Sequence, residues 1–156
     1  MLEIDIPGFG LVELDHLVSD YSGTLSSSGK IIPGVKERLN KIAEFMQVHI
    51  LSSDTFGCAR EELRDITCII HILSGRDHDV QKEQYVTKLG HERVVALGNG
   101  NNDRKMLKIA RLGIAVSASE GCSTEAILAA DILVHSPLDG LDLMLDPKRC
   151  KATLRF

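Results

Sequence analysis

Residues 18–25 read VSDYSGTL. An apolar run ends on the carboxylate of Asp20, and a turn that contains Gly23 and several hydroxyl side chains follows at once. A strand that ends in such a turn is typical of a parallel α/β sheet, in which the loops after the strands bind ligands. A carboxylate held there beside backbone N–H groups is suited to meet a phosphoryl group, which makes Asp20 a candidate nucleophile.

On either side of this stretch, short apolar runs alternate with segments of helical period. The runs that predict strands are residues 12–19, 48–52, 68–73, 93–97, 112–116 and 131–134, and the helical segments are 34–47, one that starts near Phe56, 79–89, 102–110, 121–130 and 138–145. This alternation predicts an α/β fold: a three-layer, Rossmann-like parallel sheet with helices on both faces. The whole chain, 1–156, is expected to form one domain, with an N-terminal β-hairpin over about 1–19 and a C-terminal tail over about 147–156.

The composition argues against several classes of protein. Hydrophobic residues make up 44% of the 156 residues and charged residues 26%, which is typical of a globular protein. The net charge of -4 provides no basic field, so no nucleic-acid partner is expected. No apolar run reaches the roughly 18 residues that cross a bilayer, and the N-terminus lacks the basic and apolar parts of a signal peptide. We therefore expect no membrane partner and a soluble, cytoplasmic protein.

Polar residues follow four of the predicted strands, at the point where each strand ends. They are Asp20 and Ser22, then Ser52, Ser53 and Asp54, then Ser74 to Asp77, and then Gly98 to Asp103. Because ligands of an open α/β sheet bind outside the carboxyl ends of its strands, these loops are expected to gather on one rim. Capping explains any one of them, but four loops rich in carboxylates, hydroxyls and glycines predict a phosphate and magnesium site. The segment RDHD at 76–79 is interpreted as solvated capping, with substrate binding as the alternative.

The same residues resemble the motifs of haloacid dehalogenase-type phosphohydrolases. DYSGTL at 20–25 is similar to the first motif of that superfamily, D-x-D-G-T-[LV], and more similar still to the D-K-T-G-T-L of P-type ATPase phosphorylation domains. SSD at 52–54 stands where the ATPases carry T-G-D, Lys82 stands in the place of the motif lysine, and GNGNND at 98–103 resembles G-D-G-x-N-D. The resemblance spans about residues 13–146, and four motifs in the right order make it specific.

This resemblance implies a magnesium-dependent mechanism with an aspartyl-phosphate intermediate. Asp20 would attack phosphorus, while Ser52 and Lys82 would neutralise charge on the transferring oxygens. The remaining candidates are contacts to phosphate or substrate, namely Ser22, Gly23, Ser53 and Asn102, and ligands of Mg²⁺, namely Asp20, the backbone carbonyl of Ser22, Asn99 and Asp103. Asp103 has an alternative role, as the residue that orients Lys82.

Two positions depart from the phosphatase pattern. Ser22 stands where the phosphatases carry a second aspartate that serves as general acid and base, and a hydroxyl cannot shuttle a proton in this way. Asn99 stands where the magnesium-binding aspartate is expected, so the affinity for the metal should be lower. The first interpretation is a phosphohydrolase that resembles a free-standing P-type ATPase phosphorylation domain and whose intermediate breaks down slowly. The alternatives are a binding or regulatory module that has lost the chemistry, and an ordinary phosphatase of sugars or nucleotides.

The segment from Ser26 to Pro33 is too short to hold the cap domain that many soluble relatives place over the active site. The fold is therefore expected to be capless, with an open site. The phosphorylated substrate would then be large, or a neighbouring subunit of a homo-oligomer would cover the site.

Overall fold

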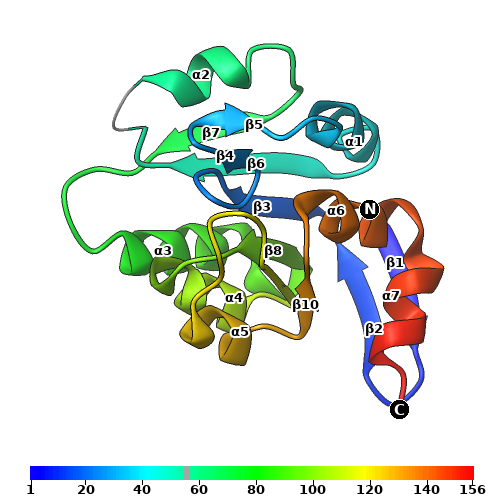
Figure 1. Cartoon of the computed structure of the whole chain (residues 1–156). Helices are drawn as coiled ribbons and strands as arrows, with labels where there is room; N and C mark the ends of the chain where they lie inside the picture. Colours follow the sequence, from blue (N-terminus) through cyan, green and yellow to red (C-terminus); the bar gives the residue numbers. More distant parts are fainter. Residues whose placement is uncertain (55–56) are drawn as a thin grey trace.

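The computed structural model of the chain describes residues 1–54 and 57–156. Its centre is a six-stranded parallel sheet with the strand order β10-β9-β8-β3-β6-β7 (Figure 1). The strands are β3 (His16–Asp20), β6 (Gln47–Ser52), β7 (Ile69–Ile72), β8 (Val94–Gly98), β9 (Leu112–Val116) and β10 (Ile132–Val134). Phe56, near which the sequence places the start of the second helix, lies outside the described residues.

Helices cover both faces of this sheet, as Figure 1 shows. On one face α1 (Val35–Ile42), α2 (Cys58–Glu62) and α6 (Pro137–Leu145) share a hydrophobic core, and on the other α3 (His78–Leu89), α4 (Arg104–Ile109) and α5 (Thr124–Ala129) share a second core. Two short 3-10 helices, η1 (His91–Arg93) and η2 (Asn101–Asp103), precede β8 and α4. The three-layer arrangement confirms the predicted α/β fold.

Successive residues of the central strands supply these two cores in turn. In β3, Leu17 belongs to the core on the α1 side and Val18 to the core on the α3 side, and both are fully buried. Ile50 and Leu51 of β6 divide in the same way. Side chains alternate across a strand, so a sheet covered on both faces needs continuous apolar runs. Each such side chain contributes roughly 1.5–3 kcal/mol by its burial.

Asp20 lies beside the switch in strand order. The chain passes from β3 to β6 and β7 at one edge of the sheet, then returns to β8 on the other side of β3 and continues to β9 and β10. β3 consequently pairs with both β6 and β8 in parallel. The loops that follow these three strands open at the same edge, which is where ligands of such sheets bind.

The N-terminal segment forms the predicted hairpin, but the single strand predicted over 12–19 is two strands. β1 (Leu2–Ile6) pairs antiparallel with β2 (Gly10–Leu14), outside the main sheet. The chain leaves the hairpin at Asp15, whose Oδ2 accepts a hydrogen bond from Nε of Arg93 at 2.7 Å, and then enters β3. The apolar pattern runs through this break because the hairpin and the sheet bury side chains in the same core.

Residues 147–156 form the helix α7 (Pro147–Leu154) rather than the expected tail. Cys150 is fully buried, and the N–H of Phe156 donates to the carbonyl oxygen of Pro7 at 3.1 Å, so the end of the chain packs against the hairpin (Figure 1). Proline in the first turn suits a helix start. The segment is too basic, and carries too few apolar residues, to show a helical hydrophobic pattern.

Between Ser26 and Pro33 the chain forms only the small hairpin of β4 (Ser26–Ser27) and β5 (Lys30–Ile31), in agreement with the capless fold. Among residues 1–54 and 57–156, no helix has the length and apolar character needed to cross a membrane.

Candidate active site

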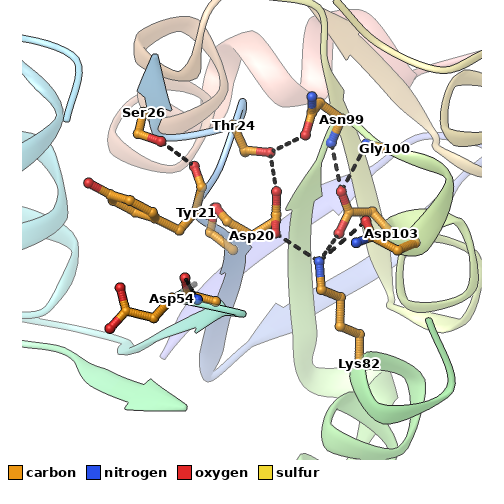
Figure 2. A network of polar contacts seen from close by, with 12 residues as sticks. Asp20, Tyr21, Thr24, Ser26, Asp54, Lys82, Asn99, Gly100 and Asp103 are labelled. Carbon is orange, nitrogen blue, oxygen red and sulfur yellow. Dashed lines mark hydrogen bonds and ion pairs between the residues drawn. The ribbon is translucent and has the colours of Figure 1, made fainter. Parts of the chain in front are cut away.

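Polar side chains from separate segments meet at the carboxyl ends of β3 and β8 (Figure 2). Asp20 is the last residue of β3, and Lys82 reaches it from α3. Asn99 and Asp103 come from the segment that joins β8 to α4. Since the sheet fixes β3 beside β8, residues that are far apart in the sequence form one polar cluster.

The carboxylate of Asp20 is held at both oxygens. Oδ1 accepts a hydrogen bond from Nζ of Lys82 at 2.8 Å, and Oδ2 accepts one from Oγ1 of Thr24 at 3.1 Å. Burial raises the pKa of Asp20 to about 6, and the nearby charge of Asp103 acts in the same direction, against the lowering effect of Lys82. A carboxylate with this pKa is largely ionised at neutral pH, as a nucleophile must be.

Lys82 lies between two carboxylates and is only 1% exposed. Its Nζ is 2.8 Å from Oδ1 of Asp20 and 2.6 Å from Oδ1 of Asp103. Burial alone lowers the pKa of Lys82, but the charges of the two carboxylates outweigh it and raise this pKa above its ordinary value. With Lys82 protonated and both carboxylates ionised, the cluster carries one uncompensated negative charge.

Asp103 holds the loop after β8 in place. Its Oδ2 accepts hydrogen bonds from the N–H groups of Asn99, at 3.0 Å, and Gly100, at 2.9 Å, while Oδ1 accepts from Lys82. The carboxylate packs against Gly98, where an added Cβ would lie 2.5 Å from Cβ of Asp103. Both oxygens of Asp103 are thus already engaged, and the side chain is fully buried. This geometry suits the orientation of Lys82 better than the binding of a metal ion.

The turn after Asp20 is shaped to place Asn99 beside the carboxylate. Oγ1 of Thr24 is 3.1 Å from Oδ2 of Asp20 and 3.1 Å from Oδ1 of Asn99, so this hydroxyl lies between the two groups (Figure 2). Gly23 has a φ of 76°, and an added Cβ would lie 2.6 Å from Nδ2 of Asn99. Glycine is therefore needed here for two reasons: the turn has a left-handed backbone, and the amide of Asn99 lies too close to leave room for a Cβ.

Most of the predicted site residues line one cavity of about 230 Å³, referred to below as the Asp20 cavity. They are Asp20, Ser22, Ser53, Lys82, Asn99 and Asn102. Gly23 and Asp103 do not line this cavity. Gly23 packs against Asn99, and Asp103 holds Lys82 and Asn99 by hydrogen bonds. Ser52 lines a neighbouring cavity, and its Oγ accepts a hydrogen bond from the N–H of Asp54 at 3.0 Å.

Two residues of the site were not assigned a role from the sequence. Thr24 links Asp20 to Asn99, and the only signal for it is its place in the quoted stretch. His78, at the start of α3, lines the Asp20 cavity. Its Nε2 is buried and has no hydrogen-bond partner among the described residues, whereas buried polar groups nearly always have one. The sequence suggested substrate binding by residues 76–79 as the alternative to capping, and this atom is an observation in its favour.

The donors at the site fit Mg²⁺ better than a softer metal. Within the described ranges there is no group of three or more His, Cys, Asp or Glu side chains that could hold a metal ion. Asp20, Asn99 and Ser22 are among the residues that line the Asp20 cavity, and they can offer a carboxylate, an amide oxygen and a backbone carbonyl oxygen. Mg²⁺ is usually bound by one or two carboxylates together with water and phosphate oxygens. The uncompensated negative charge of the cluster also favours a cation there.

A family model described as haloacid dehalogenase-like hydrolase matches residues 77–136, a range that contains Lys82, Asn99 and Asp103. Two uncharacterized proteins of Methanocaldococcus jannaschii are also similar to parts of the chain. MJ0073 is 48% identical over 65 residues, which cover 42% of this chain and 70% of that protein. MJ0072 is 46% identical over 39 residues, which cover 25% of this chain and 89% of that protein.

Solved structures of phosphatases share the fold over most of the chain. The 3-deoxy-D-manno-octulosonate 8-phosphate phosphatase of Moraxella catarrhalis, solved with magnesium, phosphate and its sugar, has a TM-score of 0.70 and 16% identity, and the match covers 91% of this chain and 94% of that one. The cobalt-bound deoxy-D-mannose-octulosonate 8-phosphate phosphatase of Haemophilus influenzae has a TM-score of 0.70 and 12% identity, with 92% and 94% covered.

Proposed function

Since this chain belongs to the haloacid dehalogenase-like hydrolases, we propose that it is a magnesium-dependent phosphohydrolase that works through a phosphorylated Asp20. One observation carries the proposal: the carboxylate of Asp20 ends β3, lines a cavity and is paired with the buried Lys82. A buried carboxylate and ammonium at the switch point of a parallel sheet are suited to phosphoryl transfer.

In the first step, an oxygen of Asp20 attacks phosphorus and the bond between phosphorus and the ester oxygen breaks. The leaving group departs as an alcohol after it takes up a proton from water, and Asp20 becomes an acyl phosphate. Lys82 neutralises charge on the transferring oxygens, while Asp103 keeps its ammonium in place. His78 lines the same cavity, and its Nε2, which has no partner among the described residues, would donate a hydrogen bond to a phosphoryl oxygen or to the substrate.

In the second step, water attacks the phosphoryl group and releases Asp20. A carboxylate placed as general base would accelerate this step about 100-fold or more. Ser22 holds the position where such a carboxylate is expected, so the phosphorylated form should persist. This persistence is the feature in which the chain would resemble the P-type ATPase phosphorylation domains.

Magnesium, when bound, supplies positive charge that offsets the phosphoryl oxygens and the excess carboxylate of the cluster. Asp20, the carbonyl oxygen of Ser22 and the amide oxygen of Asn99 would hold it. Because Asn99 is neutral, the affinity for magnesium should be lower than at a site with two carboxylate ligands. Asp103 contributes by positioning Lys82 rather than as a ligand.

Mass spectrometry of the phosphorylated protein tests the proposal. Incubation with acetyl phosphate and Mg²⁺ should add one phosphoryl group, which peptide mapping assigns to Asp20. Asp20→Asn should remove the label, whereas Asp65→Asn, which changes an exposed carboxylate, should keep it. A label that survives Asp20→Asn would contradict the assigned nucleophile.

The second candidate function is a binding or regulatory module without turnover, and the residues Ser22 and Asn99 favour it. Titration with beryllium fluoride and Mg²⁺ separates the two candidates, because this complex mimics a phosphoryl group on a carboxylate. Binding at millimolar magnesium that is lost in Asp20→Asn supports the phosphohydrolase. An absence of binding supports the module.

Between Ser26 and Pro33, where a cap domain would be inserted, the described chain forms the small hairpin of β4 and β5, so we infer that the site is open on this side. A phosphorylated substrate large enough to fill the opening is one solution. A homo-oligomer in which a second copy covers the site is the other. Light scattering at several protein concentrations distinguishes them.

A further inference from the structure

A second cavity, of about 520 Å³, lies beside the Asp20 cavity and shares Ser22 and Ser53 with it. We name it the outer cavity. We propose that the outer cavity binds the leaving group of the substrate, and that it selects small leaving groups that are neutral or carry an amine over leaving groups that carry an acid. This inference rests on the proposed phosphohydrolase function and adds the substrate class to it.

The position of the outer cavity indicates a leaving-group site. A phosphoryl group bound at Asp20 occupies the Asp20 cavity. The rest of the substrate must then extend past the residues that line both cavities. Ser22 and Ser53 are those residues. The volume is within the range of about 300–1,000 Å³ found for small-molecule sites, which favours a metabolite over a macromolecule.

The charges along the outer cavity are negative. Asp54, in the loop after β6, and Glu120, in the loop after β9, both line it. None of the described residues that line it is Lys, Arg or His. Lys30 and Arg60 each follow a lining residue in the sequence but do not line the cavity themselves. An acidic leaving group would therefore meet two carboxylates and no compensating cation.

Each of the two carboxylates accepts a hydrogen bond from a backbone N–H group. Oδ1 of Asp54 accepts a hydrogen bond from the N–H of Ala59 at 2.9 Å, and Oε2 of Glu120 accepts one from the N–H of Ser28 at 3.1 Å. Ser28 and Asp54 also have left-handed backbones, with φ of 51° and 43°. Non-glycine residues in this region are strained, and such strain is often retained where a site is organised in advance.

Tyr21 also lines this cavity. Burial raises the pKa of its hydroxyl to about 12, and the charges of Glu62, Cys58 and Asp54 act in the same direction. Its ring, together with Ala59, offers an apolar surface, while Ser28 and Ser52 offer hydroxyl groups. A small polyol or amino sugar combines the matching properties: hydroxyl groups, an apolar face and no negative charge.

Three phosphate esters that share a six-carbon chain test the selectivity: glucosamine 6-phosphate, glucose 6-phosphate and 6-phosphogluconate. We expect kcat/KM for release of phosphate to be lowest for 6-phosphogluconate, by at least about tenfold, because like charges in a binding site are strongly unfavourable. Glu120→Lys should narrow or reverse this preference. Glu125→Gln, which removes an exposed carboxylate that does not line the outer cavity, should leave the preference unchanged.

Two further measurements separate this inference from the function on which it rests. Acetyl phosphate has too small a leaving group to reach the outer cavity, so its labelling of Asp20 reports on the chemistry alone. Calorimetry of the three esters on Asp20→Asn reports on selectivity without turnover. If 6-phosphogluconate binds or reacts as well as glucose 6-phosphate, the inference is overturned, even where acetyl phosphate labels Asp20. If labelling fails but the esters bind in the expected order, the selectivity stands and the phosphohydrolase function falls.

Discussion

Replacing Asp20 by Asn should stabilise the folded protein at neutral pH while it removes the nucleophile. The pKa of Asp20 is 3.8 in an ordinary environment and about 6 in the fold. The folded state thus holds the proton more tightly than the unfolded state does. The ionised form is correspondingly disfavoured by folding, and Asn, which is neutral and of the same shape, resembles the protonated form.

The size of the effect follows from the shift of the pKa. Each unit is worth about 1.36 kcal/mol, so a shift of about two units penalises the ionised form by roughly 3 kcal/mol in the folded state. This penalty is fully present above pH about 6 and is lost as the pH falls toward 3.8. Asp20→Asn should therefore raise the free energy of unfolding by roughly 3 kcal/mol at pH 7, or Tm by about 6–12 °C, and by little at pH 4.

Asp103→Asn is the matched control, and it should lower the free energy of unfolding where Asp20→Asn raises it. Asp103 accepts hydrogen bonds from Lys82, Asn99 and Gly100 and is fully buried. An amide there turns an N–H₂ group toward donors and leaves the ammonium of Lys82 with one carboxylate fewer. The loss of a partner from a buried charged network costs about 3–5 kcal/mol.

Urea unfolding of the wild type and both variants, followed by circular dichroism at pH 4 to 8 without magnesium, measures these effects. Addition of Mg²⁺ should then stabilise the wild type more than Asp20→Asn, because the metal binds only the folded state. The reasoning is refuted if Asp20→Asn is less stable than the wild type at pH 7, or if the two proteins show the same pH dependence between pH 4 and 6.

Three further substitutions test the roles of single residues. Ser22→Asp should speed the decay of phosphorylated Asp20 by about 100-fold or more, measured as loss of the label with time, because it supplies a general base; an unchanged decay would contradict the role given to this position. Gly23→Ala should weaken the binding of Mg²⁺ because the added Cβ displaces Asn99. Gly29→Ala is the control: Gly29 has a φ of 79° and nothing within 4 Å, so this change should cost only the backbone strain of about 1–3 kcal/mol. Calorimetry with Mg²⁺ measures the loss of binding, and urea unfolding measures the cost in stability. His78→Ala should weaken binding of orthovanadate about tenfold through one lost hydrogen bond, while His71→Ala, which does not line the Asp20 cavity, should not.

The layers of the fold could be predicted from the sequence because a strand that is buried on both faces shows as a continuous apolar run. A strand such as β3 or β6 must be apolar at successive positions, and this pattern is local. The ends of helices were less well predicted, since α1 ends at Ile42 rather than near residue 47. The break at Asp15 and the helix α7 could not be predicted, because hairpin, sheet and helix share one core and the pattern does not say which partner a side chain meets.

The order of the elements can be predicted from the sequence alone. The same is true of the residue types on the rim, including the carboxylate of Asp20 and the departures at Ser22 and Asn99. These features depend on residues that are neighbours in the chain. The burial of Lys82 between Asp20, 62 residues away, and Asp103 is seen only in the folded chain. The same is true of Ser52, which lines a different cavity from the nucleophile. A lysine on a helix is ordinarily solvated, and its burial here depends on two carboxylates that only the sheet brings together.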